Sequence, residues 1–380
     1  MPELLTEEQC MIRDMVREFA LADVKPGAGQ RDVSKEFPFD IIKKMGGLGL
    51  MGIAIPEEFG GADGDTLSYI LAIEELAKVC GSTCLTLCAH FSLCTYPIYA
   101  FGSDEQKKKY LPSLASGESL GCFGLTEPGA GSDSGSTATT AVKKGENWVL
   151  NGSKRFITNG SYAQVMIAIA RTDLDSKGSH GLTAFIVDTD SAGYKVVKQE
   201  DKLGLRASDT AEIIFEDLEV SHKNVLGEVD TGFSKFMATL EGGRISIAAL
   251  GVGLGQGAMD LTIPYIKERI AFGKTLSKIE AIRSKVANMA TEINAARSLV
   301  YRAARAKDKG QPFAHIASMA KLYSSEAAVR TCNQAIQCLG GYGYMHEYDV
   351  ERFWRDSKLC EIGEGTSEIQ RLILSRHFID

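Results

Sequence analysis

The feature of this sequence that most constrains its fold is a pattern of side chains that changes twice along the chain. Up to about residue 116 apolar residues recur at helical spacing, then short β-branched and apolar runs alternate with turn residues, and long amphipathic patterns return near residue 228. One hydrophobic core rarely grows past about 250–300 residues, and this chain has 380. We therefore predict an α+β protein with an N-terminal helical domain (1–116), a middle β-domain (117–227) and a C-terminal helical bundle (228–380).

The helical stretches have recognisable beginnings and ends. Thr6 with Gln9 matches a capping box, a pairing that satisfies two free backbone N–H groups at a helix start. Pro264 lacks an N–H and crowds the preceding turn, so we expect it to end or kink its helix. Further helical patterns occur over 39–45, 67–79, 105–115, 233–260, 278–308 and 312–338.

The middle stretch carries strand and turn signals. Residues 148–150 and 155–157 flank Asn151-Gly152, a dipeptide favoured in tight hairpin turns because both residues tolerate positive φ. We therefore expect a hairpin at Asn151-Gly152. Further short strands are expected over 165–170, 182–187 and 213–220.

Charge and cysteine content exclude several classes of protein. The net charge of −7 gives no basic surface for phosphates, so we expect no nucleic-acid partner. Cys80, Cys84 and Cys88 recur every four residues without a CxxC pair, which favours buried thiols on a helix face over a metal site. No signal peptide and no apolar run of the ~20 residues that a bilayer requires is recognisable, so we expect a soluble protein without a membrane span.

A loop rich in small residues at 125–133, LTEPGAGSD, is the first segment that suggests chemistry. Small and hydroxyl residues expose backbone N–H groups that suit a polar, electron-rich ligand. The segment matches neither a GxGxxG nor a P-loop pattern, and taken alone it is equally compatible with a surface turn.

Five motifs in one order settle which family the sequence resembles: LTEPGAGSD at 125–133, RFITNG at 155–160, ERIAFGK at 268–274, QCLGGYGY at 337–344 and EGTSEIQR at 364–371. Together they resemble the acyl-CoA dehydrogenase family along essentially the whole chain. The resemblance implies that the helical bundle has four helices, that FAD lies between the β-domain and this bundle, and that the cofactor is shared across a dimer interface.

The resemblance also implies which residues contact FAD. Where the family most often has Trp, this chain has Phe156, which keeps a flat apolar face for the flavin ring and otherwise would be a plain strand residue. Arg269 and the Gly pair 340–341 suit a diphosphate held from a neighbouring subunit, although each alone fits a helix end. Glu280 stands where relatives often have a cofactor-binding Gln, and we leave it out. The implied FAD contacts are Phe123, Leu125, Thr126, Gly131, Ser132, Phe156, Ile157, Thr158, Arg269, Phe272, Gln337, Gly340, Gly341, Thr366 and Glu368.

Glu364 is the residue that the resemblance identifies as the catalytic base. In the family pattern the base removes the α-proton of a thioester while the β-hydrogen leaves as hydride to FAD. Relatives that act on branched substrates place the base at the position of Gly243, which has no side chain here. Closure of an acyl chain over Glu364 would raise its pKa toward neutrality by excluding water. As an isolated residue it would read as an ordinary carboxylate near a helix start.

The substrate is less well defined than the reaction. Contacts to the acyl-CoA are implied for Ser132, Glu241, Arg244 and Gly365. Many relatives have Tyr immediately before the base, whereas this chain has Gly363, so we expect either a wider pocket for a branched or alicyclic acyl group, or an aromatic such as Phe91 or Tyr96 filling the space.

The resemblance thus predicts a flavoprotein oxidoreductase of fatty or carboxylic acid degradation that converts an acyl-CoA to a 2-enoyl-CoA. Its expected partner is an electron-transfer flavoprotein and its expected assembly a homotetramer, in a bacterial cytoplasm or, as a mature form, in a mitochondrial matrix. The alternatives are an acyl-CoA oxidase that uses oxygen and a non-catalytic flavoprotein of the same fold. No metal ion is expected.

Overall fold

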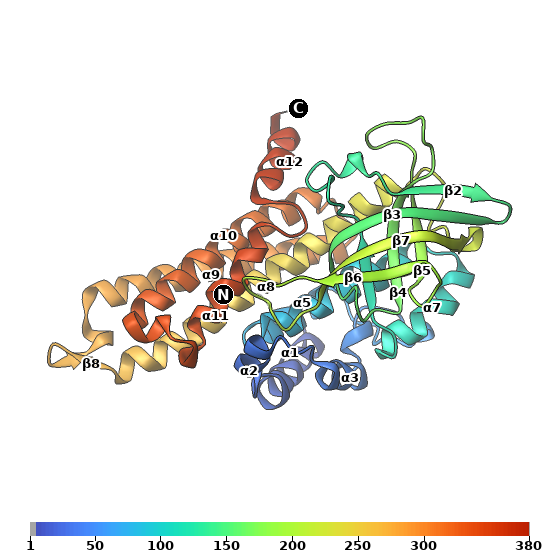
Figure 1. The fold of residues 1–380 in the computed structure, drawn as a ribbon. Coiled ribbons are helices and arrows are strands. Elements are labelled where there is room, and N and C mark those ends of the chain that lie inside the picture. The colour runs from blue at the N-terminus through green and yellow to red at the C-terminus, as the bar shows by residue number, and fades with distance from the viewer. Residues whose placement is uncertain (1–4, 380) are drawn as a thin grey trace.

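The computed structural model describes residues 5–379 and consists of a β-domain, a group of N-terminal helices and a long helical bundle (Figure 1). The predicted capping box is present: Thr6 Oγ1 accepts from Gln9 N, and Gln9 Oε1 accepts from Thr6 N, both at 3.1 Å. The N-terminal helices are α1 (Glu7–Phe19), α2 (Ala28–Ser34), α3 (Phe39–Gly47), α4 (Thr66–Ala77), α5 (Gly81–His90), α6 (Tyr96–Phe101) and α7 (Asp104–Ser116).

The β-domain contains one mixed sheet in the strand order β1-β4-β2-β3-β7-β6, with β5 paired to β4. Its seven strands are β1 (Gly121–Gly124), β2 (Thr140–Lys144), β3 (Asn147–Thr158), β4 (Val165–Arg171), β5 (Leu182–Asp188), β6 (Tyr194–Gln199) and β7 (Thr210–Ser221). A separate hydrophobic core that includes Trp148, Phe185 and Phe215 lies within this domain.

The prediction of a hairpin turn at Asn151-Gly152 is wrong, because β3 runs through both residues. The turn lies instead at Gly145-Glu146, between Lys144 and its strand partner Asn147. At Gly152 the pairing of β3 with β7 shifts register, and a Cβ there would lie 2.5 Å from Thr139 Oγ1. Gly152 therefore marks a bulge where the segment at Thr139 approaches the strand closely. A close approach of this kind is the other common reason for a glycine within a strand.

The C-terminal bundle is built on α8 (Gly232–Glu268), α9 (Glu280–Asp308) and α10 (Ala314–Leu339), with α11 (Val350–Ser357) packed against α8 and α10. A short hairpin of β8 (Ile270–Ala271) and β9 (Lys274–Thr275) lies at the far end of the bundle, and α12 (Ser367–Ile379) projects near the β-domain (Figure 1). Pro264 does not end α8, which continues for one more turn to Glu268.

The second core joins the N-terminal helices to the bundle. Glycines on α8 allow this contact: a Cβ at Gly253 would lie 2.4 Å from Ala77 Cβ, and one at Gly257 would lie 2.3 Å from Lys78 O. The two helical regions therefore share one hydrophobic interior, to which one face of β4 and β5 also contributes, while the other face of these strands belongs to the separate core of the β-domain. The domain limits at 116/117 and 227/228 stay a prediction.

The cysteines and the apolar helices are accounted for by packing. Eight cysteines are buried and Cys10 is partly buried, all as free thiols, and no His, Cys, Asp and Glu of residues 5–379 form a group that could hold a metal ion. The stretches Gly81–Phe101 and Gly232–Glu268 are long and apolar enough to cross a membrane by length and composition alone. Their apolar windows are 72% and 83% buried inside the fold, as in central helices of a protein core.

Candidate active site

Glu364 lies in a strained turn between α11 and α12. Its φ is +53° and that of Gly365 is +92°, a left-handed conformation that costs a non-glycine residue on the order of 1–3 kcal/mol. A Cβ at Gly365 would also lie 2.8 Å from Gln370 Nε2, so position 365 requires glycine both for φ and for space. Such strain persists where the surrounding structure holds it, and it is common at functional sites.

The carboxylate of Glu364 faces Gly243 on α8. A Cβ at position 243 would lie only 1.9 Å from Glu364 Oε2, so no side chain fits there while Glu364 keeps this rotamer. The two positions that the family resemblance offered for the base therefore share one space, and in this chain Glu364 fills it. Glu364 Oε2 is buried and has no hydrogen-bond partner among the residues that the structure describes.

Two buried cations lie beside this carboxylate. Burial raises the pKa of Glu364 to about 7, although the positive charges of Lys321 on α10 and Arg244 on α8 act in the opposite direction. Lys321 is fully buried, and its Nζ donates to Gly365 O at 2.6 Å. A carboxyl group that is half ionised near pH 7 has the protonation behaviour that a general base needs at neutral pH.

Arg244 and Glu241, the implied contacts to the substrate arm, occupy the same face of α8. Arg244 is 3% exposed and its Nε has no partner within the described chain. Burial lowers the pKa of Arg244, and burial raises that of Glu241, with each charge partly offsetting the effect on the other. Arg244 therefore lies beside the base and within the protein, where it cannot act as a solvent-exposed anchor.

The loop 125–133 is held at its base by a buried ion pair that the sequence analysis did not identify. Glu127 accepts from Lys154 Nζ at 2.6 Å, from Ala138 N at 2.6 Å and from Thr139 N at 3.1 Å. Lys154 is fully buried and also donates to Leu125 O. Glu127 stands inside the recognised motif, but its partner lies 27 residues away on β3, a distance that no local pattern reveals.

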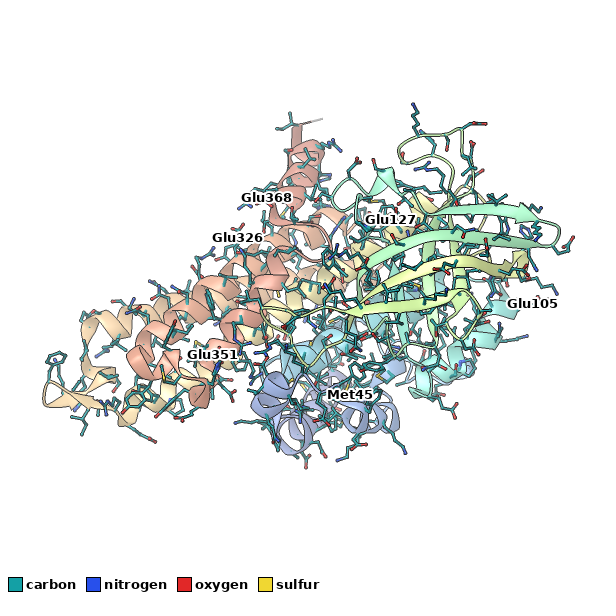
Figure 2. The ribbon with its side chains drawn as sticks, in the orientation of Figure 1. Met45, Glu105, Glu127, Glu326, Glu351 and Glu368 are labelled. Carbon is teal, nitrogen blue, oxygen red and sulfur yellow. The ribbon has the colours of Figure 1, made fainter. Side chains whose placement is uncertain are left out.

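These contacts anchor the loop and leave its tip free. Figure 2 shows Glu127 on the side of the β-domain where α12 projects. Beyond it, Gly131 and Ser132 are exposed, and nothing lies within 4 Å of a Cβ built at Gly129 or Gly131. The backbone of the loop tip is therefore open to a ligand, as the sequence analysis expected.

The implied flavin contacts on β1 and β3 lie next to this loop but differ in exposure. Leu125, Thr126 and Thr158 are partly buried, and Phe123 is 9% exposed. Phe156 is 59% exposed with a φ of +59° at a bulge, and the Arg155 guanidinium lies 5.2 Å from its ring. The Ile157 side chain is 2% exposed in the β-domain core, so a contact from this residue to a cofactor would come from its main chain.

A second group of implied FAD contacts lines one open cavity of about 610 Å³ at the β8–β9 end of the bundle. Gly340 also caps α10 with a φ of +62°, and the Arg269 guanidinium, at the end of α8, lies 5.4 Å from the Tyr342 ring. The cavity lies at the C-terminal end of α10, whereas Lys321, which donates to Gly365 O in the Glu364 turn, lies near the N-terminal end of that helix. The predicted contacts in this cavity are Arg269, Phe272, Gln337, Gly340 and Gly341.

The remaining predicted FAD contacts lie near the start of α12. Thr366 Oγ1 accepts from Ile369 N at 3.3 Å and so caps the helix. Glu368 is exposed in its first turn, as Figure 2 shows. Glu280 is the exposed first residue of α9 and contributes nothing to the cavity.

A small cavity of about 20 Å³ adjoins the neighbouring face of α8. Phe91 and Tyr96 line it, and the Lys307 ammonium lies 3.8 Å from the centroid of the Tyr96 ring. Around Gly363 a Cβ would meet only Leu359, at 3.6 Å or more, so the missing side chain leaves some free space there. The other residues that line the small cavity are Ala54, Thr66, Tyr69, Ile70, Ser92, Gly242 and Ser246.

Comparisons with known proteins agree along the whole chain. Three family models match in order: acyl-CoA dehydrogenase N-terminal domain (6–118), middle domain (122–218) and C-terminal domain (230–379). A short-chain specific acyl-CoA dehydrogenase of Clostridium acetobutylicum is 48% identical over 98% of each chain.

Two solved structures are similar over the complete chains. The butyryl-CoA dehydrogenase of Megasphaera elsdenii is 42% identical with a TM-score of 0.98, covering 100% of both chains. A chain described as electron transferring flavoprotein of Acidaminococcus fermentans, in work on flavin-based electron bifurcation, is 47% identical with a TM-score of 0.98 and the same coverage.

Proposed function

The chain belongs to the acyl-CoA dehydrogenase family, and from that premise we propose that it oxidises a short acyl-CoA to the 2-enoyl-CoA, with FAD as cofactor and Glu364 as base. The observation that carries the proposal is the Glu364 carboxylate: its Oε2 is buried without a hydrogen-bond partner in residues 5–379, and burial raises its pKa to about 7. An unpartnered carboxylate of this kind is costly to keep unless a ligand uses it.

The residues present suit FAD. The exposed ring of Phe156 offers a flat apolar surface, and the open tip of the 125–133 loop offers backbone N–H donors. Arg269 and the unobstructed backbone at Gly340 and Gly341 suit a diphosphate. FAD, when bound, accepts the hydride that leaves the β-carbon of the substrate.

Glu364 performs the proton transfer. The α-hydrogen of a thioester is weakly acidic, so a carboxylate removes it only where the negative charge that develops on the thioester oxygen is stabilised. No described residue accepts a hydrogen bond from the Glu364 N–H, which is therefore free to donate to that oxygen. Arg244 and Lys321 add positive charge on the side of the base.

We propose a short acyl group. The cavity beside Phe91 and Tyr96 is only about 20 Å³, close to the space of one water molecule. Phe91 and Tyr96 therefore leave little space on the face of α8 at Gly242, next to Gly243, although Gly363 itself does not line this cavity. The similarity to a short-chain specific enzyme and to a butyryl-CoA dehydrogenase points the same way. A branched or alicyclic group is the alternative.

The proposed electron acceptor is an electron-transfer flavoprotein, supported by the similar Acidaminococcus chain. We further propose a homotetramer in which the cavity of Arg269 and Phe272 meets the flavin of a neighbouring subunit, because one chain holds the two groups of contacts far apart. The 93% exposed Phe272 ring supports a partner at this hairpin. A bacterial cytoplasm or a mitochondrial matrix fits the relatives.

Anaerobic titration of the yellow protein with a panel of acyl-CoAs tests the proposal. We expect butyryl-CoA to bleach the visible flavin absorbance most completely, with branched, alicyclic and octanoyl thioesters less effective. Fast reoxidation in air, compared with reoxidation by an electron-transfer flavoprotein, would identify an oxidase. Absence of bleaching by every thioester would overturn the enzymatic proposal in favour of a non-catalytic flavoprotein.

A further inference from the structure

Lys321 is a fully buried cation without a carboxylate partner in contact. It lies on α10, is 0% exposed, and its Nζ donates a hydrogen bond to Gly365 O at 2.6 Å. No ion pair within 4.0 Å involves it among the described residues. Burying an unpaired ammonium costs several kcal/mol, so an apolar side chain would be the more stable choice if only packing mattered.

The carbonyl that Lys321 binds belongs to the strained turn that carries the base. Glu364 and Gly365 are consecutive left-handed residues, a conformation that must be held from outside. Lys321 holds it from α10, and Gln370 holds it from α12 by donating to Gly365 O at 3.0 Å. The Gly365 carbonyl thus joins the base to two helices.

The charge of Lys321 faces the base as well. The charged groups that act on Glu364 are Lys321 from α10 and Arg244 from α8. Around Lys321, Glu361 and the Cys360 thiol lie on the segment before the turn, and Arg244 lies across from it. Burial lowers the pKa of Lys321 to about 8, so it remains mostly protonated at the pH where Glu364 ionises.

We propose that Lys321 is a positioning residue for Glu364: its ammonium fixes the turn through the Gly365 carbonyl and supplies positive charge that stabilises the ionised base. This inference deepens the proposed function and rests on it for its catalytic consequence. The physical coupling between the two side chains can be measured without any substrate.

The first test is the pH dependence of flavin reduction by butyryl-CoA in the holoenzyme, in wild type and in K321M, whose side chain has similar length and no charge. We expect the acid limb of the rate profile to move to higher pH by about one unit or more, because an opposing charge is lost. K321R keeps the positive charge, so the acid limb of its rate profile should lie within a few tenths of a pH unit of the wild-type limb. Bound flavin and KM should change little.

The second test is a double-mutant cycle on thermal stability at pH 7.5, above the pKa of Glu364 and below that of Lys321, with K321M, E364Q and the double variant. If the ammonium stabilises the ionised carboxylate, E364Q raises the melting temperature more in the K321M background than in wild type. Lys358 provides the control, since it pairs with Glu361 at the surface, and K358M should show no coupling to E364Q.

The outcomes separate the two proposals. An additive cycle together with an unmoved acid limb in K321M would overturn the role of Lys321, even if butyryl-CoA still bleaches wild type. Failure of every acyl-CoA to bleach wild type would overturn the proposed function, while the stability cycle would still decide the coupling. Should K321M fail to fold, K321Q and K321R carry the same two measurements.

Discussion

Two glutamates with buried carboxylate oxygens, Glu127 and Glu364, lie beside buried lysines, and their protonation behaviour is opposite. Burial alone raises the pKa of Glu127, but Lys154 at 2.6 Å and the N–H groups of Ala138 and Thr139 bring it below its ordinary value. Burial raises the pKa of Glu364 to about 7, because Lys321 binds a carbonyl and leaves the carboxylate without a direct donor. A nearby cation is therefore not enough to keep a buried carboxylate ionised; direct hydrogen bonds decide.

The difference also separates two uses of a buried acid. Glu127 accepts several hydrogen bonds and fixes the base of the 125–133 loop, whereas Glu364 Oε2 has no partner in residues 5–379 and occupies the space that a side chain at Gly243 would fill. A satisfied acid stabilises structure, and an unsatisfied one is available for chemistry.

The largest expected effect is that of E364Q on turnover. The amide cannot take the α-proton, so we expect the rate of flavin reduction by butyryl-CoA to fall by about 10²–10⁴-fold, the range of general base catalysis. Stopped-flow absorbance measures this rate, and flavin content should stay at the wild-type level. Full turnover in E364Q would remove the distinction between the two glutamates.

E127A should act on stability. It leaves the Lys154 ammonium buried without its partner, and we expect a loss of about 3–5 kcal/mol in the free energy of unfolding. Urea denaturation followed by circular dichroism measures this. The control E216A removes the exposed Lys195–Glu216 pair and should cost less than about 1 kcal/mol. Equal losses in the two variants would contradict the structural role of Glu127.

G243A tests the space that Glu364 occupies. The new Cβ would lie 1.9 Å from Glu364 Oε2, so the carboxylate must move, and misplacement of about 1 Å can cost 10²-fold in rate. We expect kcat to fall by about that factor while the melting temperature changes little, because alanine favours the helix. G47A, at the end of α3, is the control, since nothing lies within 4 Å of a Cβ there. Unchanged kcat in G243A would place the active rotamer of Glu364 elsewhere.

The smallest effect is on the pH dependence of stability. The folded pKa of Glu364 is raised from 4.5 to about 7, so the unfolded chain releases this proton first and stability falls as pH rises between those values. The folded pKa of Glu127 is lowered, so its contribution is present above pH 4.5 and is lost as pH falls. Melting temperatures of wild type and E364Q should therefore diverge from pH 5 to 8, with E364Q the more stable at pH 8. Parallel curves would contradict the raised pKa.

The sequence predicted the elements that local rules control. The capping box at Thr6, the amphipathic helices and most strands follow from side-chain periodicity and turn residues, and the structure confirms them. The error at Asn151-Gly152 has a physical reason: glycine serves a turn and a close approach equally well, and only the position of Thr139 shows which one applies. Pro264 was predicted to end or kink α8; the helix continues past it to Glu268, and a kink there stays a prediction.

The residues of the candidate site likewise fall into those that the sequence identified and those that only the structure revealed. The recognised motifs placed Glu364, Phe156 and Arg269 in the sequence, but they could not reveal Lys154 or Lys321, whose partners lie 27 and 44 residues away. A lysine on an amphipathic helix normally reads as a surface residue, and only burial identifies it as part of a site.

The sequence by itself determined the family, the order of helical and β regions, and the residue types available for chemistry, because these depend on local pattern and on motif order. Tertiary structure alone decided which carboxylate is satisfied and which is free. That outcome depends on donors brought from distant elements to within about 3 Å, the range in which a hydrogen bond offsets the loss of water.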